Sequence, residues 1–408
     1  MRVLLSTIGS RGDVQPLVAL AFQLRLLGVD VRLCVPPDFQ DWIKGLGMEV
    51  RPIGPELRWT AKPPAPVAMP TPEQRRQMMD ETVSIQFRTI TEAAEGCDVI
   101  VGATALQIAA PSVAEKMGVP YVFAAYCPTV LPSSHHAPPV LAMRGDTPAT
   151  NATDFPSLWT RDAERFSALF GPALNANRAA LGLTPVEDVR AHVFTSQPWL
   201  AADKTLAPWP DSEDEAVFQT GAWILPDQNN LSPELEAFLD AGEPPVYFGF
   251  GSIRAPENVA AAMIGASRAL GRRAIVSRGW ADLSLVDDQS DCFLAGEVNQ
   301  LALFRRVAAV VHHGGAGTTT AAALCGAPQV IAPQVYDQHH WAQQIERLGV
   351  GAAHPPEQPT ALSLATAIQR ALQPVVVGRA RSLSADITIE GARCAAERLI
   401  SGDLPIRF

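Results

Sequence analysis

Short apolar segments alternate with helical segments along most of this chain. Residues 3–6 form an apolar run, a polar turn with glycines follows, and after Pro16 apolar side chains recur with the helical period until Gly28. A second apolar run covers residues 31–35, and the same order returns from residues 97–103 onward. Alternation of strands and helices with short turns requires parallel strands and right-handed crossovers. The pattern therefore predicts an α/β fold.

The second half of the chain repeats this plan. The segments "PPVYFGFGS", "RRAIVSRGW", "AAVVHHGGAG" and "APQVIAP" each end a predicted strand and lead into a loop and a helical pattern. Between the two halves, proline, acidic residues and asparagine break the periodicity, as in a linker. We expect two similar α/β units, residues 1–205 and 233–385, joined by a linker at residues 206–232. We also expect a C-terminal helix in residues 386–408 that packs back on the first unit.

Two proline-rich stretches, residues 52–72 and 128–154, show no periodicity. Irregular insertions of this length are lids, binding loops or plain surface loops, and the sequence leaves these alternatives open. His135 and His136 lie in the second stretch. Because no third ligand accompanies them, the pair indicates a surface position or a contact with a bound molecule rather than a metal site.

Composition excludes several classes of protein. With 408 residues, 47% of them hydrophobic, the chain can fill a core in each unit. Six scattered cysteines without a C-x-x-C pair indicate neither a disulfide framework nor a zinc site. The net charge of −10 argues against a nucleic-acid partner, because binding its backbone needs clustered Lys and Arg. No apolar run reaches about 18 residues, so we expect a cytoplasmic protein with no stable membrane insertion.

Polar and glycine-bearing clusters follow several of the predicted strands. In open parallel sheets, ligands bind beyond the carboxyl ends of the strands, so these clusters can converge on one cleft between the two units. The clusters are residues 10–13, Ser252, residues 278–280, residues 312–318, and Asp337 with Gln338.

The segment "VVHHGGAGTTTAAALCGAP", residues 310–328, places glycines between a buried strand and a helix. Backbone N–H groups and the positive end of the helix dipole converge at such a turn and bind anions, most often phosphates. The patterns G-x-G-x-x-G and Walker A are both missing, which favours a diphosphate joined to neither nicotinamide nor a transferable γ-phosphate. The candidate donors to a diphosphate are Ser252, His313, Gly315, Ala316, Gly317 and Thr318.

Several segments together resemble a known family. They are "GSRGDVQPLVALAFQL", "VYFGFGS", "SRGW", "HHGGAGTT" and the Asp-Gln pair at residues 337 and 338, with "EGCDVIV", "QPWLAAD", "QTGAWILPD" and "ELEAFLDAG" adding to the likeness. The chain resembles the bacterial nucleotide-sugar glycosyltransferases of the GT-B fold, in particular the vancomycin-type glycopeptide-antibiotic glycosyltransferases. More distantly, it resembles the sterol glucosyltransferases.

This resemblance implies two facing Rossmann-like domains with parallel sheets and an interdomain cleft. The first domain would hold the acceptor, and the second would hold the nucleotide-sugar donor. The implied reaction is an inverting transfer of a hexose to a hydroxyl of a hydrophobic polycyclic or phenolic natural product, a glycopeptide aglycone or a steroid-like molecule. It would need no metal and no cofactor besides the donor, for which UDP-glucose is the first choice. A monomer or weak dimer is expected.

The resemblance also assigns roles to individual residues. Asp13 matches the general base, Ser10 lies near the β-phosphate, and His313 with residues 315–318 matches the phosphate grip. Asp337 and Gln338 match the pair that hydrogen-bonds sugar hydroxyls. The region that holds the nucleoside corresponds to Arg278, Trp280 and Val298. The segment "VYDQHHWAQQ" departs from the family because it lacks the proline and tyrosine that follow Asp-Gln in the glycopeptide enzymes.

The chemistry of these residue types is consistent with those roles, and each residue has a structural alternative. An aspartate with a pKa of about 4 cannot ionise an alcohol beforehand, so Asp13 would take the proton late, as the new bond forms. Asp13 could instead cap the helix that follows it. Trp280 could stack on a pyrimidine or fill the domain interior. Of the two adjacent histidines, we expect His313 to face phosphate and His312 to be a core residue.

Other patterns and functions compete with this reading. Asp337 and Gln338 could cap a helix, although a carboxylate beside a carboxamide suits adjacent sugar hydroxyls. The acidic segment at residues 286–292 is better explained as a solvated loop than as a metal site. A nucleotide-sugar epimerase of the same architecture would not need the proline-rich insertions of the first unit. A non-catalytic sugar-nucleotide-binding protein would not need Asp13 beside the phosphate motif.

Overall fold

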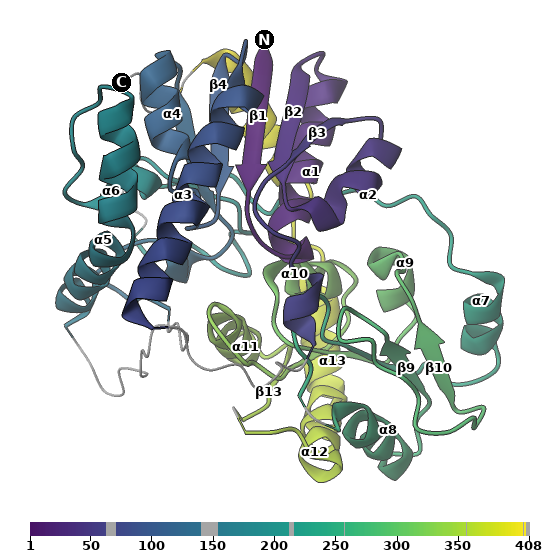
Figure 1. The fold of residues 1–408 in the computed structure, drawn as a ribbon. Helices are drawn as coiled ribbons and strands as arrows, with labels where there is room; N and C mark the ends of the chain where they lie inside the picture. The colour runs from purple at the N-terminus through teal and green to yellow at the C-terminus, as the bar shows by residue number, and fades with distance from the viewer. Residues whose placement is uncertain are drawn as a thin grey trace.

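The computed structural model describes residues 1–62, 71–139, 154–211, 216–256, 258–355, 357–402 and 404. It consists of two α/β units, one above the other in Figure 1. Parts of the two proline-rich stretches, residues 63–70 and 140–153, lie outside the described residues.

The first unit is built on a parallel sheet with the strand order β3-β2-β1-β4-β5-β6-β7. Its strands are β1 (Arg2–Thr7), β2 (Asp30–Val35), β3 (Glu49–Pro52), β4 (Val99–Ala103), β5 (Tyr121–Ala125), β6 (Trp199–Leu200) and β7 (Phe218–Gln219). Its helices are α1 (Arg11–Leu26), α2 (Gln40–Gly45), α3 (Pro72–Ala94), α4 (Ala110–Met117), α5 (Phe155–Ala180) and α6 (Val189–Phe194), with 3-10 turns η1 (Pro37–Phe39), η2 (Arg58–Ala61) and η3 (Pro128–Val130).

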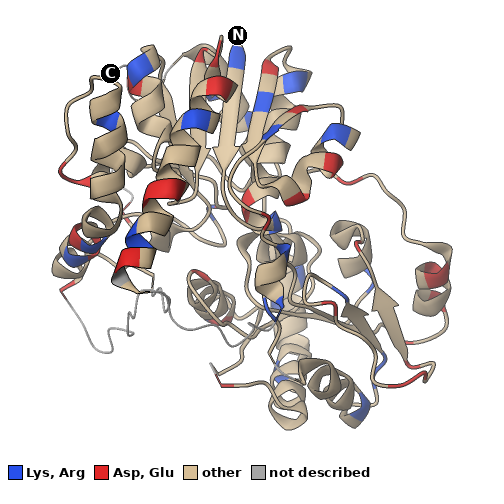
Figure 2. Ribbon diagram, viewed as in Figure 1, with Lys and Arg blue, Asp and Glu red and all other residues tan. Residues whose placement is uncertain are grey.

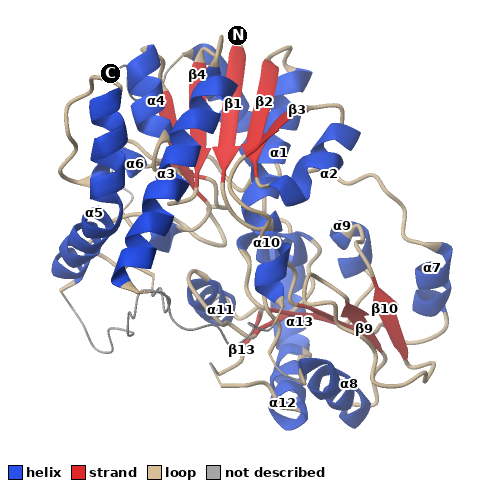
Figure 3. Cartoon of the chain, viewed as in Figure 1, coloured by secondary structure: helices blue, strands red, loops and turns tan. Residues whose placement is uncertain are grey.

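The second unit holds another parallel sheet, with the order β10-β9-β8-β11-β12-β13. Its strands are β8 (Val246–Gly249), β9 (Ala274–Ser277), β10 (Cys292–Ala295), β11 (Ala309–His312), β12 (Gln329–Ile331) and β13 (Gly351–Ala353). Its helices are α7 (Pro233–Asp240), α8 (Val259–Ala269), α9 (Gln300–Phe304), α10 (Ala316–Leu324), α11 (Gln338–Arg347), α12 (Ala361–Ala371) and α13 (Pro374–Leu383). Helix α14 (Gly391–Ser401) ends the described chain. Figure 3 shows helices flanking both sheets, as the predicted α/β fold requires.

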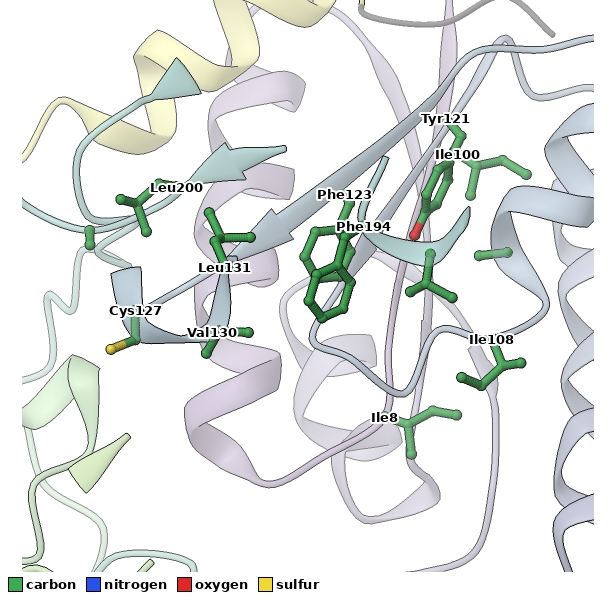
Figure 4. Close-up of a cluster of buried hydrophobic side chains, with 14 of the residues drawn as sticks. Ile8, Ile100, Ile108, Tyr121, Phe123, Cys127, Val130, Leu131, Phe194 and Leu200 are labelled. Carbon is green, nitrogen blue, oxygen red and sulfur yellow. The ribbon is translucent and has the colours of Figure 1, made fainter. Parts of the chain in front are cut away.

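Successive side chains of a strand point to opposite faces, and the two faces of the first sheet carry separate cores. Leu4 packs in the core beneath α3, α4 and α5, whereas its neighbours Val3 and Leu5 pack in the core beneath α1 and α2. Figure 4 shows part of the first of these cores. There Phe123 stacks on Phe194 of α6 with 4.5 Å between ring centroids.

The strand orders place a topological switch point in each sheet. In the first sheet, β1 lies between β2 and β4, so the chain builds one side of the sheet before it crosses to the other. In the second sheet, β8 lies in the same way between β9 and β11. Ligands of open α/β sheets bind at such points, beyond the carboxyl ends of the strands. The turns after β1, β8 and β11 are therefore the places where a site is expected.

The linker segment and the last helix both connect the second unit to the first. Strand β7 pairs with β6, so the segment at residues 206–232 contributes a strand to the first sheet before it reaches α7. Helix α14 returns to the first unit, where Ala395 and Leu399 are fully buried in the core that α1 lines. In Figure 1 the yellow end of the chain lies behind the first sheet.

The described residues contain no helix long and apolar enough to cross a membrane. Among these same residues, no group of three or more His, Cys, Asp or Glu side chains is placed to hold a metal ion. Figure 2 shows cationic and anionic residues interspersed along the same helices.

Candidate functional site

The turn between β11 and α10 has the geometry of an anion-binding turn. Gly314 has a φ of +97°, and a Cβ there would lie 2.7 Å from Cγ2 of Ile331, so only glycine fits. Gly315 is the N-cap residue and α10 starts at Ala316. The first N–H groups of a helix have no partner within the helix and lie at the positive end of its dipole. The residues expected to grip phosphate, Gly315 to Thr318, are thus the first turn of α10.

The two adjacent histidines have different surroundings. His312 is fully buried, its Nδ1 accepts the N–H of Gly314 at 3.1 Å, and its Nε2 lies 2.9 Å from Oε1 of Gln329. Burial lowers the pKa of His312 to about 3, so the ring is neutral. His312 is a core histidine whose two ring nitrogens both have partners, as the sequence predicted.

His313 is packed between the turns that follow β8 and β11. A Cβ on Gly251 would lie 3.2 Å from its Cε1, and one on Gly315 would lie 2.7 Å from its Nε2. Its Nδ1 is buried and has no hydrogen-bond partner. Burial lowers the pKa of His313 to about 4, so this ring is also neutral near pH 7. The backbone of Gly249 interacts with this ring, and it is Nε2 that lies on the side of Gly315, beside the start of α10.

The turn after β8 is joined to the turn after β9. Gly251 has a φ of +60°, and its carbonyl accepts the N–H of Trp280 at 2.9 Å. A Cβ on Gly279 would lie 2.6 Å from that carbonyl oxygen, so both positions need glycine. Ser252 is half-buried in this turn. Three of the clusters predicted from the sequence therefore meet beside the β8/β11 switch point.

The residues expected to hold the nucleoside lie on the β9 and β10 side of this point. Trp280 stacks on Phe39 of η1, with ring centroids 5.7 Å apart and an interplanar angle of 24°. Arg278 is exposed and pairs with Asp282 at 3.2 Å. Val298 is half-buried and packs against the hydrophobic core of the second unit. Trp280 thus bridges the two units with one face of its indole.

Asp13 occupies the third position of α1 and is half-buried. Its Oδ2 accepts the N–H of Ser10 at 2.6 Å and the hydroxyl of Ser10 at 3.2 Å, so the capping role is present. Burial raises the pKa of Asp13 to about 6, and the bonds from Ser10 only partly offset this rise. The hydroxyl of Tyr126, at the end of β5, donates to the Asp13 carbonyl at 3.0 Å. Tyr126 was not predicted, since its contact depends on how β5 and α1 meet.

Asp337 lies across the cleft from Asp13, close enough for the two carboxylates to interact electrostatically. Its Oδ2 accepts the indole N–H of Trp341 at 3.0 Å. Burial raises the pKa of Asp337 to about 7, and the charge of Asp13 contributes to this rise. Two carboxylates, one from each unit, thus share one partly desolvated space.

Gln338 is used differently from its neighbour. It is 5% exposed, and its Oε1 accepts the N–H groups of Gln334 and Val335 at 2.8 and 3.1 Å. Only its amide NH₂ group is left for a ligand. The carboxamide oxygen instead closes the loop that presents Asp337, a role that local sequence did not indicate.

Three buried polar atoms near α11 have no partner. They are Nε2 of His136, Nε1 of Trp209 and Nε2 of His340. The rings of His136 and Trp209 are in edge contact at 6.1 Å, and His136 and His340 interact electrostatically. Buried polar groups without partners are costly in a folded protein and call for a ligand or water. His136 is half-buried between the rings of Trp159 and Trp209, whereas its neighbour His135 is exposed.

A cavity of about 460 Å³ lies elsewhere. It is lined by Gln23 of α1, Asp227, Asn299, Arg305 and residues at the start of α14. None of the predicted site residues lines it, and Asn299 uses its side chain to hold the linker carbonyls of Asp227 and Asn229. The predicted phosphate-binding residues of the second unit lie instead at the turns after β8 and β11.

Comparison with known proteins agrees with this geometry. A model of the glycosyltransferase family 28 N-terminal domain matches residues 3–133, and a model of the erythromycin biosynthesis protein CIII-like C-terminal domain matches residues 282–390. The chain is 50% identical over 404 residues to glycosyltransferase GtfE of Amycolatopsis orientalis, covering 98% of this chain and 97% of that protein. It is 49% identical over 402 residues to the vancomycin aglycone glucosyltransferase of the same organism, with the same coverage.

A solved structure shows the same fold. The glycotransferase of kitacinnamycin aligns with a TM-score of 0.74 at 18% identity, covering 99% of each chain. By its near full-length likeness to the two Amycolatopsis proteins and by its two facing parallel-sheet units, this chain belongs to the GT-B natural-product glycosyltransferases, in the vancomycin-type glycopeptide-antibiotic group.

Proposed function

We propose that this glycosyltransferase moves glucose from UDP-glucose to a hydroxyl of a glycopeptide-type aglycone, with inversion at the anomeric carbon. The observation that carries the proposal is the meeting of His313, Gly251 and the start of α10 at the β8/β11 switch point, with Asp13 and Asp337 interacting across the cleft. Phosphate and acceptor sites on opposite units are what a single displacement between two bound substrates requires.

The diphosphate leaving group gains negative charge in the transition state. The N–H groups of Ala316, Gly317 and Thr318 at the start of α10 offer preorganised donors to that charge, and Nε2 of His313 lies beside them on the side of Gly315. Because these donors are neutral, the turn binds an anion through dipoles rather than through a net positive charge. We propose that Ser252 adds a further donor, that Ser10 adds one when its hydroxyl turns from Asp13 to the phosphate, and that no metal ion or other cofactor is needed. Full activity in excess EDTA is the expected result.

Asp13 is proposed as the base that receives the acceptor proton. Its carboxylate is partly desolvated, which raises its pKa to about 6 and makes it a better proton acceptor than an exposed aspartate. It is still ionised near pH 7. A base on the far side of the anomeric carbon from the leaving group gives one in-line displacement, so an α-linked donor yields a β-glucoside.

Asp337 is proposed to hold hydroxyls of the sugar, with the amide NH₂ of Gln338 as its neighbour. Arg278, Trp280 and Val298 are proposed to contact the nucleoside. On the acceptor side, the unpaired atoms of His136, Trp209 and His340 support a polar contact to a hydrophobic aglycone.

We also propose that the chain acts in the cytoplasm, as its six free cysteines suggest. Since one chain supplies both units of the cleft, we propose a monomer or weak dimer.

The experiment is incubation with UDP-glucose and vancomycin aglycone, followed by mass spectrometry and by NMR of the anomeric proton. A product heavier by one hexose, with the β configuration, is expected. Replacing UDP-glucose by dTDP-glucose at equal concentration tests the nucleotide. An α-glucoside would contradict the inverting mechanism, and an isomerised donor or no reaction with a panel of aglycones would contradict the transfer itself.

A further inference from the structure

Gln329 is an unusual residue for the place that it occupies. It is the first residue of β12, lies beside β11 in the middle of the second sheet, and is 0% exposed. A buried carboxamide is costly unless its oxygen and its NH₂ group are both hydrogen-bonded. Both are bonded here, one to the last residue of β11 and the other to α10, on either side of the connecting turn.

The first partner is His312. Since Nδ1 of His312 accepts the N–H of Gly314 at 3.1 Å, that nitrogen carries no proton in the neutral ring. The proton therefore sits on Nε2, which donates to Oε1 of Gln329 at 2.9 Å. The carboxamide oxygen thus selects the tautomer that lets His312 hold Gly314, the residue whose φ of +97° shapes the turn.

The second partner is α10 itself. Nε2 of Gln329 donates to the carbonyl oxygen of Thr319 at 3.2 Å. One buried side chain therefore connects the end of β11, the glycine turn and the first turns of the helix. These are the elements that set the directions of the N–H groups of residues 316–318.

We propose that Gln329 is a positioning residue for donor binding: through His312 and Thr319 it holds the β11–α10 turn in the conformation that receives the diphosphate. This inference rests on the proposed function, because it assigns Gln329 to the phosphate end of the same site. Gln329 does not itself touch the ligand.

Two variants test the role by calorimetry with UDP and with inorganic pyrophosphate. Gln329→Met keeps the size of the side chain and removes both bonds, so affinity for both probes should fall by about tenfold or more. Gln86→Met is the matched control: Gln86 is 1% exposed and bonds the N–H of Ala109 in the first unit, so its variant should lose thermal stability without losing affinity for UDP.

Gln329→Glu gives a second, independent readout. The carboxylate still accepts from Nε2 of His312, but it cannot donate to the carbonyl oxygen of Thr319, so affinity should fall at every pH. It also favours the doubly protonated ring of His312, which can no longer accept from Gly314. The affinity ratio of wild type to variant for pyrophosphate should therefore rise as the pH is lowered from 8 to 6. His313 is the titratable side chain that interacts with His312, and it is neutral in this range. If Gln329→Met does not fold, this variant carries the test alone.

The outcomes separate this inference from the proposed function. Wild-type affinities in a folded Gln329→Met, or a wild-type affinity for pyrophosphate at every pH in Gln329→Glu, would overturn the positioning role. A wild-type protein that binds pyrophosphate but transfers no sugar would contradict the proposed function and leave the role of Gln329 intact. A wild-type protein that binds neither UDP nor pyrophosphate would overturn both.

Discussion

At the scale of single residues, Asp13 combines a capping role with a raised pKa, the property that the proposed base requires. Its Oδ2 accepts two bonds from Ser10 and so caps α1, while burial raises its pKa to about 6. A cap and a base can coexist because a carboxylate has two oxygens and about four lone-pair positions. The capping bonds also fix the direction in which the second oxygen points.

Asp13→Asn keeps an oxygen for capping and removes the base. We expect kcat to fall by about 10²- to 10⁴-fold, with little change in UDP affinity or melting temperature. In wild type, kcat/KM should rise with pH through about 6, because the base works only when its proton has left. A large loss of melting temperature with a modest loss of turnover would show that capping is the main role of Asp13.

Asp337 gives a prediction about stability as well as activity. Its pKa is raised to about 7 in the folded protein, above the unfolded value of about 3.9, so the folded state binds its proton more tightly. This group therefore makes the protein less stable as the pH rises from about 4 to about 7. Asp337→Asn should have a melting temperature above that of wild type at pH 8, and the difference should shrink towards pH 4.

The same variant should lose activity with the sugar nucleotide while it keeps its affinity for UDP, because UDP lacks the hydroxyls proposed to bind Asp337. Calorimetry with UDP and turnover with UDP-glucose measure the two effects. Equal losses for both would indicate that Asp337 only supports the loop at residues 334–338.

At the scale of elements, the end of β11 separates the two adjacent histidines, because His312 is the last residue of the strand and His313 is the first residue after it. His312 lies in the strand, where both of its ring nitrogens are paired. His313, one residue later, is past the end of the strand and has an unpaired Nδ1. Because successive side chains of a strand point to opposite sides, adjacent histidines cannot share one role here.

We expect His313→Ala to weaken UDP binding by about 1–3 kcal/mol through the loss of a hydrogen bond to phosphate, with little change in melting temperature. His312→Ala should destabilise the fold by about 1–3 kcal/mol, since it leaves buried groups of Gly314 and Gln329 without partners. Calorimetry with UDP and thermal unfolding of both variants measure these effects. The roles would be reversed if His312→Ala lost UDP binding at unchanged stability and His313→Ala did not.

At the scale of the whole molecule, the C-terminal helix makes the first unit dependent on the end of the chain. Helix α14 packs on α1. A Cβ at Gly391 would lie 2.3 Å from the backbone carbonyl carbon of Gly221, so the start of α14 is in close backbone contact with the segment after β7. Phe39 and Trp280 stack across the cleft, and Arg11 lies 3.9 Å from Glu297. The site is thus assembled from parts that are far apart in sequence.

Leu399→Ala should destabilise the protein by about 2–5 kcal/mol, because Leu399 is fully buried between α14 and the core of the first unit. Its neighbour Ile400 is 43% exposed, so Ile400→Ala is the matched control and should change stability by less than about 1 kcal/mol. Chemical unfolding of both variants measures the difference. Similar small effects would mean that α14 does not stabilise the first unit.

Local patterns in the sequence determined the α/β fold, a buried strand just before the two adjacent histidines, and the need for glycine in the turn that follows. Each of these depends on a residue's own conformational freedom or on side-chain periods of about two and about four residues, which the sequence displays directly. The same reasoning placed the candidate residues at strand ends, and the topology of parallel sheets then brings such ends to one edge.

The tertiary structure alone decided how those residues are used. The carboxamide of Gln338 faces its own loop, Trp280 stacks on Phe39 of the other unit, β7 joins the first sheet from within residues 206–232, and Gln329 holds His312. These facts depend on contacts between segments distant along the chain or on a choice among hydrogen-bond partners. Neither periodicity nor propensity encodes the hydrogen-bond partner of a side chain. That partner is decided by tertiary packing, which excludes water and brings one polar group rather than another within hydrogen-bonding distance.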